Sequence, residues 1–213
     1  MKWDFQRSKD RLSSERARIQ DAGLNIQRLS REMNLSNLSP TDARIVHGCH
    51  IYCHINNFAD VLDSPLMRKE DFKRLHRLLH ILRIEQRLTL QQVFDGDKIQ
   101  VQGPKFHGLL YKPYDDDPGL AWKSVLAGIA LNLILRNALP EVFPDYPTLM
   151  PSTGISLGDC LVANIGPRGE RELISVGAAA NHAAKILENN NALTISYSLW
   201  SSFRRTSRPL LPR

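Results

Sequence analysis

Three groups of polar residues in this sequence are of types that could do chemistry. The segment 54–58 (HINNF) directly follows an alternating apolar run, and Asp97 lies in an Asp-Gly-Asp turn signal. Asn181 and Lys185 are four positions apart, so they share one face of any helix that contains them. Imidazole and carboxylate groups can bind a divalent cation, whereas an amide and an ammonium can orient and neutralise an anion. The net charge of +6 is compatible with a polyanionic ligand.

The elements that must position these residues can be predicted from periodicity. Residues 45–55 alternate β-branched and aromatic side chains, which predicts a strand with His50, Tyr52 and His54 on one face. Asp95-Gly96 predicts a tight hairpin turn. Periodicity predicts helices over 70–88, 120–138 and 179–190, the second of which is stopped by Pro140. It predicts the two hairpin strands within 90–103, and further strands over 153–166, 171–177 and 192–200. This order predicts an α+β fold in which helices pack against a mixed sheet.

The two ends of the chain differ in composition from the middle. Within residues 5–34 the spacing of apolar side chains predicts one or two amphipathic helices, with a possible break at Gly23; the spaced residues are Ile19, Leu24, Ile26, Leu29 and Met33. The predicted organisation is an N-terminal helical extension over 1–40, a main domain over 41–200 and a basic tail over 201–213.

Composition excludes several classes of protein. The 213 residues carry a net charge of +6 and 3 Cys, and the N-terminus is too charged for a signal peptide. No run of about 18 apolar residues is present. We therefore predict a soluble cytoplasmic protein that binds neither nucleic acid nor a membrane. A basic N-terminal arm that binds DNA is a weaker alternative.

Together the segments resemble the class III nucleotidyl cyclases. The segment 54–58 resembles their D-I-x-x-F motif, and Gly96-Asp97 resembles the G-D that carries their second metal carboxylate. Residues 154–166 resemble their glycine-bounded strand, and residues 175–185 resemble their V-I-G-D-x-V-N-x-A-x-R helix. The resemblance covers about 45–190 and implies a class III cyclase-like mixed sheet. Within the class, the chain looks most like the Pycsar antiphage cyclases, which make cyclic UMP or cyclic CMP.

The resemblance implies roles for particular residues. It assigns Mn²⁺ or Mg²⁺ binding to His54, Ile55 and Asp97, and catalysis to Asn181 and Lys185. It assigns contacts with the substrate, UTP or CTP, to the following five residues: Tyr52, Ile55, Asn56, Asn57 and Phe58. It also implies a homodimer with its sites at the subunit interface, and a separate effector that senses the cyclic product.

Two departures from the family pattern affect the expected activity. His54 replaces the first metal carboxylate, and imidazole suits Mn²⁺ better than Mg²⁺. Purine-specific relatives contact the base with a Lys four positions before the hairpin Asp and with an Asp just after the glycine of the last motif. Val93 stands at the first of these positions and Ala178 at the second, so a pyrimidine is favoured. We therefore predict a uridylate cyclase that forms cyclic UMP and pyrophosphate. The alternatives are a cytidylate cyclase and a degenerate cyclase-like module that binds a nucleotide or a partner.

Overall fold

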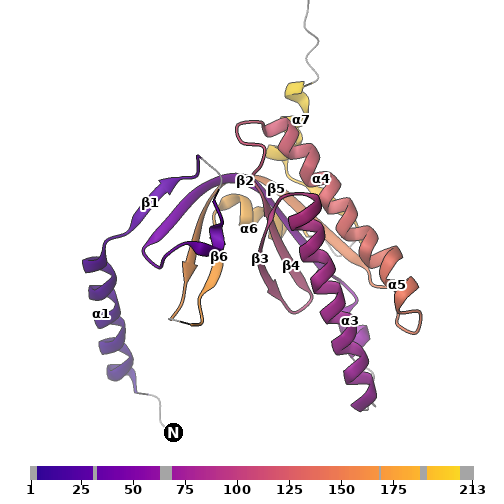
Figure 1. Ribbon diagram of the computed structural model, residues 1–213, viewed down its shortest axis with the longest axis horizontal. Coiled ribbons are helices and arrows are strands. Elements are labelled where there is room, and N and C mark those ends of the chain that lie inside the picture. Colours follow the sequence, from indigo (N-terminus) through magenta and orange to yellow (C-terminus); the bar gives the residue numbers. More distant parts are fainter. Residues whose placement is uncertain (1–3, 31–32, 63–68, 168, 188–190, 207–213) are drawn as a thin grey trace, which may run out of the picture.

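The computed structural model describes residues 4–30, 33–62, 69–167, 169–187 and 191–206 (Figure 1). Their strands form one seven-stranded sheet with the order β3-β4-β2-β5-β6, to which β1 adds beside β2 and β7 beside β5. The strands are β1 (Asn25–Arg28), β2 (Asp42–Ile55), β3 (Asp97–Gln102), β4 (Lys105–Leu110), β5 (Pro151–Ile165), β6 (Glu172–Val176) and β7 (Leu193–Ile195). The sheet is mixed, because β1 and β7 pair in parallel and the other pairs are antiparallel. The predicted α+β fold is confirmed.

Helices cover both faces of this sheet. They are α1 (Phe5–Ala22), α2 (Phe58–Leu62), α3 (Lys69–Leu88), α4 (Asp117–Leu133), α5 (Leu139–Val142), α6 (Ala178–Lys185) and α7 (Tyr197–Thr206). A short 3₁₀ turn, η1 (Leu35–Asn37), and two π-helical segments, η2 (Thr89–Val93) and η3 (Ile134–Ala138), complete the regular structure of the described residues.

The central strand β2 separates two hydrophobic cores. Cys49, Ile51 and Cys53 point to the face that packs against α3, α4 and α7, where they join the larger core. Val46, on the opposite face, joins a smaller core with Leu35 and other side chains from η1, β4 and β5. The alternation predicted for residues 45–55 is therefore observed, because successive side chains of a strand point to opposite faces.

Helix α6 lies against β5 and β2 on the face of the smaller core, and a glycine lets it approach closely. A Cβ atom on Gly154 would lie 2.2 Å from the carbonyl oxygen of Ala183. Because that oxygen belongs to the backbone of α6, the helix must shift to accept any side chain. We expect Gly154→Ala to lower the free energy of unfolding by about 1–3 kcal/mol, measured by urea denaturation. Unchanged stability would contradict this account of the packing.

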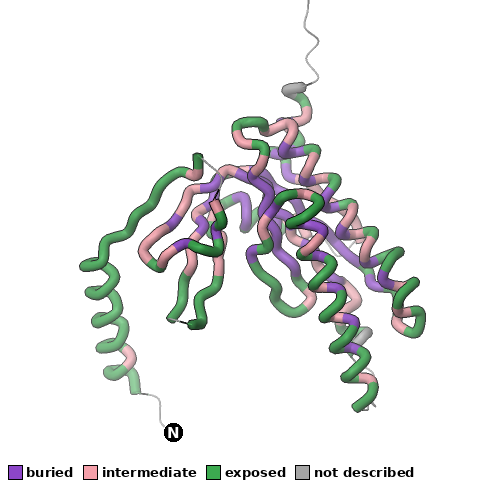
Figure 2. The backbone as a smooth tube through the Cα atoms, in the orientation of Figure 1, coloured by how far each residue is buried: buried purple, intermediate pink, exposed green. Residues whose placement is uncertain are grey.

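The N-terminal segment differs from the prediction of one or two helices over 5–34. Helix α1 is capped by the side chain of Asp4, ends at Gly23 with φ +70° and buries none of its residues. After this break, residues 25–28 form β1 instead of a second helix. Strand β1 pairs in parallel with β2, beginning with Asn25 opposite Asp42. Figures 1 and 2 show this exposed arm extending away from the rest of the fold.

Two other predicted boundaries are wrong. Pro140 does not stop the long helix, because α5 continues directly after η3 with Pro140 in its first turn, where its missing N–H is tolerated. The strand predicted over 192–200 ends at Ile195. Helix α7 follows it and continues past residue 201, where the tail was predicted to begin. Residues 188–190 and 207–213 of the predicted last helix and tail lie outside the described residues.

One helical stretch, Asp117–Val142, is long and apolar enough to cross a membrane by length and composition. Buried helices of soluble proteins pass the same test. Here Ala121, Ala127 and Leu131 are buried in the larger core.

Candidate functional site

The hairpin next to β2 turns at a different place from the prediction. Strand β3 ends at Gln102 and β4 begins at Lys105, so the turn is Gly103-Pro104. Gly103 has φ +53°, a conformation that favours glycine. Residues 90–93, predicted as part of a strand, belong to the π-helical η2 that continues α3. Asp95-Gly96 therefore connects a helix to a strand, and the predicted hairpin turn there is wrong.

This difference moves Asp97 away from His54. Asp97 opens β3 opposite Leu109, whereas His54 pairs with Lys105 at the other end of β4. Leu109 and Lys105 are four residues apart on β4, which corresponds to about 13 Å along the strand. Strand β4 also lies between β3 and β2, so Asp97 and His54 are on different strands at different ends of the hairpin. Within one subunit the two side chains cannot share a metal ion.

The Asp97 carboxylate has a partner inside the fold. The hydroxyl of Tyr111 donates a hydrogen bond to Asp97 Oδ2 at 2.6 Å. Burial, followed by the hydrogen bond and charge of Asp97, raises the pKa of Tyr111 far above its ordinary value. The contact accounts for Asp97 as a residue that holds β3 against the segment after β4.

His54 lies beside the true hairpin turn. The backbone N–H of Ile55 donates to the carbonyl of Pro104 at 3.3 Å, which places the turn against the end of β2. His54 Nδ1 is 3.2 Å from Asn56 Oδ1. Burial lowers the pKa of His54, and the nearby Lys105 ammonium lowers it further.

This end of the sheet does not fit a pair of divalent cations. The class III cyclases that the sequence resembles have one carboxylate at the position of His54 and one in the hairpin G-D, and Gly103-Pro104 occupies that turn here. Within the described residues no group of three or more His, Cys, Asp or Glu side chains could hold a metal ion. A neutral imidazole and an ammonium are poor replacements for two carboxylates, because Mg²⁺ requires hard oxygen ligands.

The loop after β2 is anchored by its own amide side chains. Asn56 Nδ2 donates to Ser152 Oγ and to Asn191 Oδ1, at 2.7 Å in both cases. Asn57 donates to the carbonyl of Thr148 and accepts from the N–H of Met150. These bonds hold the loop against β5, and Phe58 packs on the larger core. Contacts of residues 55–58 with a triphosphate remain predictions.

The two residues assigned to catalysis lie on α6 as expected. Asn181 and Lys185 are both at least partly exposed, one helical turn apart. The buried residues of this helix, Ala179, Ala180 and Ala183, face the sheet. Within the described residues neither side chain makes a hydrogen bond or an ion pair, and both are exposed, so they can reach a ligand or another subunit.

A row of polar side chains crosses the sheet near the hairpin. Tyr52 stacks on His107 with ring centroids 4.0 Å apart, and His107 pairs in register with Gln100 of β3. Residues directly opposite in an antiparallel pair point to the same face, so the three side chains form one row. Burial raises the pKa of the half-buried Tyr52.

Gln100 also borders a polar pocket of about 350 Å³ between the two edge strands β3 and β6. Lys98 of β3, Asn164 of β5 and Arg171 beside β6 line the same pocket. The lining also includes the carboxylate of Glu172, so the two cations and two amides suit a polar ligand. Sequence reasoning missed Gln100 because it matched the hairpin motif to Gly96-Asp97 instead of the true turn.

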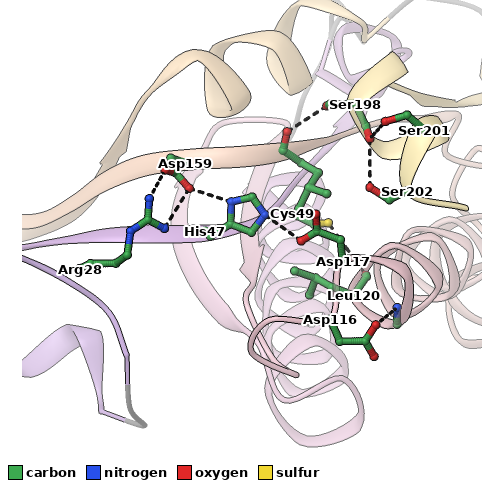
Figure 3. A network of polar contacts seen from close by, with 12 residues as sticks. Arg28, His47, Cys49, Asp116, Asp117, Leu120, Asp159, Ser198, Ser201 and Ser202 are labelled. Atoms are coloured by element: carbon green, nitrogen blue, oxygen red, sulfur yellow. Dashed lines mark hydrogen bonds and ion pairs between the residues drawn. The ribbon is translucent and has the colours of Figure 1, made fainter. Parts of the chain in front are cut away.

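A second polar network, also missed from the sequence, fastens the N-terminal arm (Figure 3). Arg28 of β1 contacts Asp159 of β5 at 2.6 Å, and His47 of β2 lies between Asp159 and Asp117 at 2.7 and 2.9 Å. Burial alone raises the pKa of Asp159, but hydrogen bonds from His47 and Arg28 outweigh it and hold that pKa below its ordinary value. The network joins β1, β2, β5 and α4, and its residues are far apart in the sequence.

Comparisons with known proteins identify similar chains. A curated protein named Uridylate cyclase from Pseudomonas aeruginosa is 29% identical over 194 residues, which are 89% of this chain and 37% of that protein. A second Uridylate cyclase, from a Rhizobium species, is 24% identical over 217 residues, covering 89% of this chain and 40% of its own length. No family model matches the chain.

Among solved structures, a class III adenylyl cyclase-like ATP-binding protein from Pseudomonas aeruginosa has a TM-score of 0.80 and 24% identity. The match covers 95% of this chain and 43% of that one. The chain thus spans less than half the length of these relatives. The comparisons confirm the class III cyclase fold and the resemblance of this chain to class III cyclases, whereas the residue roles stay predictions.

Proposed function

We propose that this chain, which has the class III nucleotidyl cyclase fold, is part of a uridylate cyclase that converts UTP to 3′,5′-cyclic UMP and pyrophosphate. The observation that carries the proposal is the likeness to two proteins named Uridylate cyclase over 89% of the chain. From the resemblance to the antiphage cyclases we also propose a cytoplasmic role in antiphage defence, with a separate effector that senses the product. The same resemblance leads us to propose a dimer with the reaction site between two cyclase units.

The chemistry assigned to this chain is the binding and charge stabilisation of the substrate. Asn181 is placed to orient the ribose, so that its 3′ oxygen attacks the α-phosphorus and pyrophosphate leaves with the α–β bridging oxygen. The 3′-hydroxyl proton passes to solvent. The ammonium of Lys185, one turn further along α6, stabilises the negative charge that develops on the phosphates.

The base contact is assigned to Gln100. Purine-specific relatives have a Lys four positions before the second hairpin residue, and with the turn at Gly103-Pro104 that position is Gln100, not Val93. Val93 belongs to η2 and is 69% exposed. The carboxamide of Gln100 can accept from the N3–H of uracil and donate to its O4.

We expect Gln100→Leu to weaken UTP binding about tenfold, because one hydrogen-bonded edge of the base loses its partner. The effect on ATP binding should be smaller. Isothermal titration with UTP and ATP measures both. Gln102→Leu, on the same strand but outside the lining of the pocket, is the control. An equal loss for both nucleotides would contradict a base contact by Gln100.

Two other functions are alternatives with support. A cytidylate cyclase is compatible with the same residues, since a carboxamide can also pair with cytosine. A non-catalytic nucleotide-binding module is favoured by the replaced metal carboxylates and by the structural neighbour described as an ATP-binding protein.

The test of the proposed function compares all four nucleotides. The purified chain, and its variants described below, are incubated with UTP, CTP, ATP or GTP in Mn²⁺ or in Mg²⁺. Cyclic products are measured by mass spectrometry, and nucleotide binding by titration. Cyclic UMP as the main product supports a uridylate cyclase, whereas mainly cyclic AMP or cyclic GMP excludes a pyrimidine cyclase. Tighter binding of ATP than of UTP, without turnover, supports the non-catalytic module.

A further inference from the structure

We propose that this chain is the substrate-binding half of a composite cyclase, completed by a second cyclase unit that carries carboxylates at the positions of His54 and Pro104. The second unit is either a separate chain or another part of a longer polypeptide. The inference rests on the proposed function and replaces the predicted homodimer with an asymmetric pair.

The first argument is the chemistry of the strand end. His54 and Lys105 are direct cross-strand neighbours, and Pro104 occupies the turn beside them. The ammonium repels a divalent cation, and neither His54 nor Pro104 supplies an anionic oxygen. A homodimer contains this end twice and has no carboxylate at these positions in either site. A symmetric pair of this chain is therefore deficient in both of its sites.

The second argument is that the opposite half of the site is present. Asn181 and Lys185 are accessible on α6, and Gln100 borders the pocket between β3 and β6. By the family resemblance, the metal-binding residues of one unit face the Asn and the basic residue of the other. One half of such a site keeps its amide and its basic residue here while the other half has lost both carboxylates, as expected for specialised partners.

The third argument is the length of the relatives. This chain covers 37% and 40% of the two curated relatives and 43% of the structural neighbour. The uncovered part of each is longer than this chain. Each therefore has room for a second unit of the same size, although a separate chain fulfils the same chemical requirement.

The experiment uses this chain as its own probe. The first variant, His54→Asp with Pro104→Asp, restores both carboxylates. The second, called the fourfold variant, also carries Asn181→Ala and Lys185→Ala. It keeps the two carboxylates but loses the substrate-binding side of α6. Pro104→Asp preserves the backbone carbonyl that accepts from Ile55. Circular dichroism and size-exclusion chromatography establish that each variant is folded and show its assembly state.

The native chain and the fourfold variant are assayed alone and mixed, with UTP and Mn²⁺. We expect each alone to have less than about 1% of the activity of the restored double variant. Random pairing in an equal mixture makes about half of the dimers mixed, each with one complete site, so about a quarter of that activity is expected. Glu141→Gln in the double variant, which removes an exposed carboxylate from α5, is the control, and it should leave the rate unchanged.

The outcomes separate this inference from the proposed function. Cyclic UMP formed by the native chain alone, at the rate of the restored variant, overturns the composite site and supports the uridylate cyclase. A mixture that regains activity but makes cyclic AMP supports the composite site and contradicts the uridylate cyclase. A folded, dimeric double variant without activity, or a mixture without activity, overturns the composite site.

Discussion

Lys185→Ala in the native chain is expected to lower cyclic UMP formation by the mixture of native chain and fourfold variant by about 100- to 1,000-fold. In the productive pair, only the native chain contributes an intact α6. Its Lys185 has no recorded partner within the described residues, so the ammonium is available for the phosphates. Loss of one charge that stabilises a transition state typically lowers the rate by this factor.

Two control substitutions make the effect specific. Lys185→Arg restores the residue that the family usually has, and we expect it to retain activity within about tenfold of the native chain. Lys73→Ala removes an exposed ammonium on α3, where Lys73 pairs with Glu70, and should not change the rate. Initial rates at saturating UTP separate a loss in kcat from a loss in binding. A rate unchanged by Lys185→Ala would remove this residue from the mechanism.

The sequence predicted strand β2 and helix α6 better than it predicted the hairpin. The alternation through Cys49–Cys53 and the helical spacing from Asn181 to Lys185 are local patterns, and the structure retains both. The position of the second metal residue depends on register, which local patterns do not determine. Asp-Gly is the strongest short hairpin signal, and it favoured residues 95–96 over the true turn at Gly103-Pro104.

The short strand β1 shows a second limit of local patterns. Leu24, Ile26 and Leu29 fit a helical spacing as well as an extended one, and a four-residue strand has little periodicity of its own. Tertiary contacts decide between the two. Pairing with β2 and the ion pair between Arg28 and Asp159 place this segment in the sheet, and neither partner is near it in the sequence.

A buried pair of histidines gives the fold a predicted sensitivity to acid. His50 and His107 are buried on adjacent strands, with His50 Nδ1 3.0 Å from His107 Nε2. Burial lowers the pKa of His50 to about 4. Burial and the charge of His50 together lower the pKa of His107 to about 3. The folded protein therefore keeps both rings neutral at a pH where an ordinary histidine is protonated.

The direction of the effect follows from where the protons bind. Between the ordinary pKa of about 6.5 and the folded value near 4, the unfolded chain binds protons that the folded chain does not. Stability is therefore full above pH 6.5 and decreases as the pH falls toward 4. A pKa shift of this size in one histidine corresponds to about 3 kcal/mol. Urea denaturation at a series of pH values measures the decrease.

The double substitution His50→Gln and His107→Gln removes both titrating rings and keeps hydrogen-bonding side chains in their place. We expect it to lower stability at about pH 7, because a packed pair is replaced, but to flatten the decrease between about pH 6.5 and 4. His76→Gln with His80→Gln removes two exposed histidines from α3 and should leave the slope unchanged. If the double variant of the buried pair retains the native slope, the acid sensitivity arises elsewhere, and these two rings are not the groups that must take up protons on unfolding.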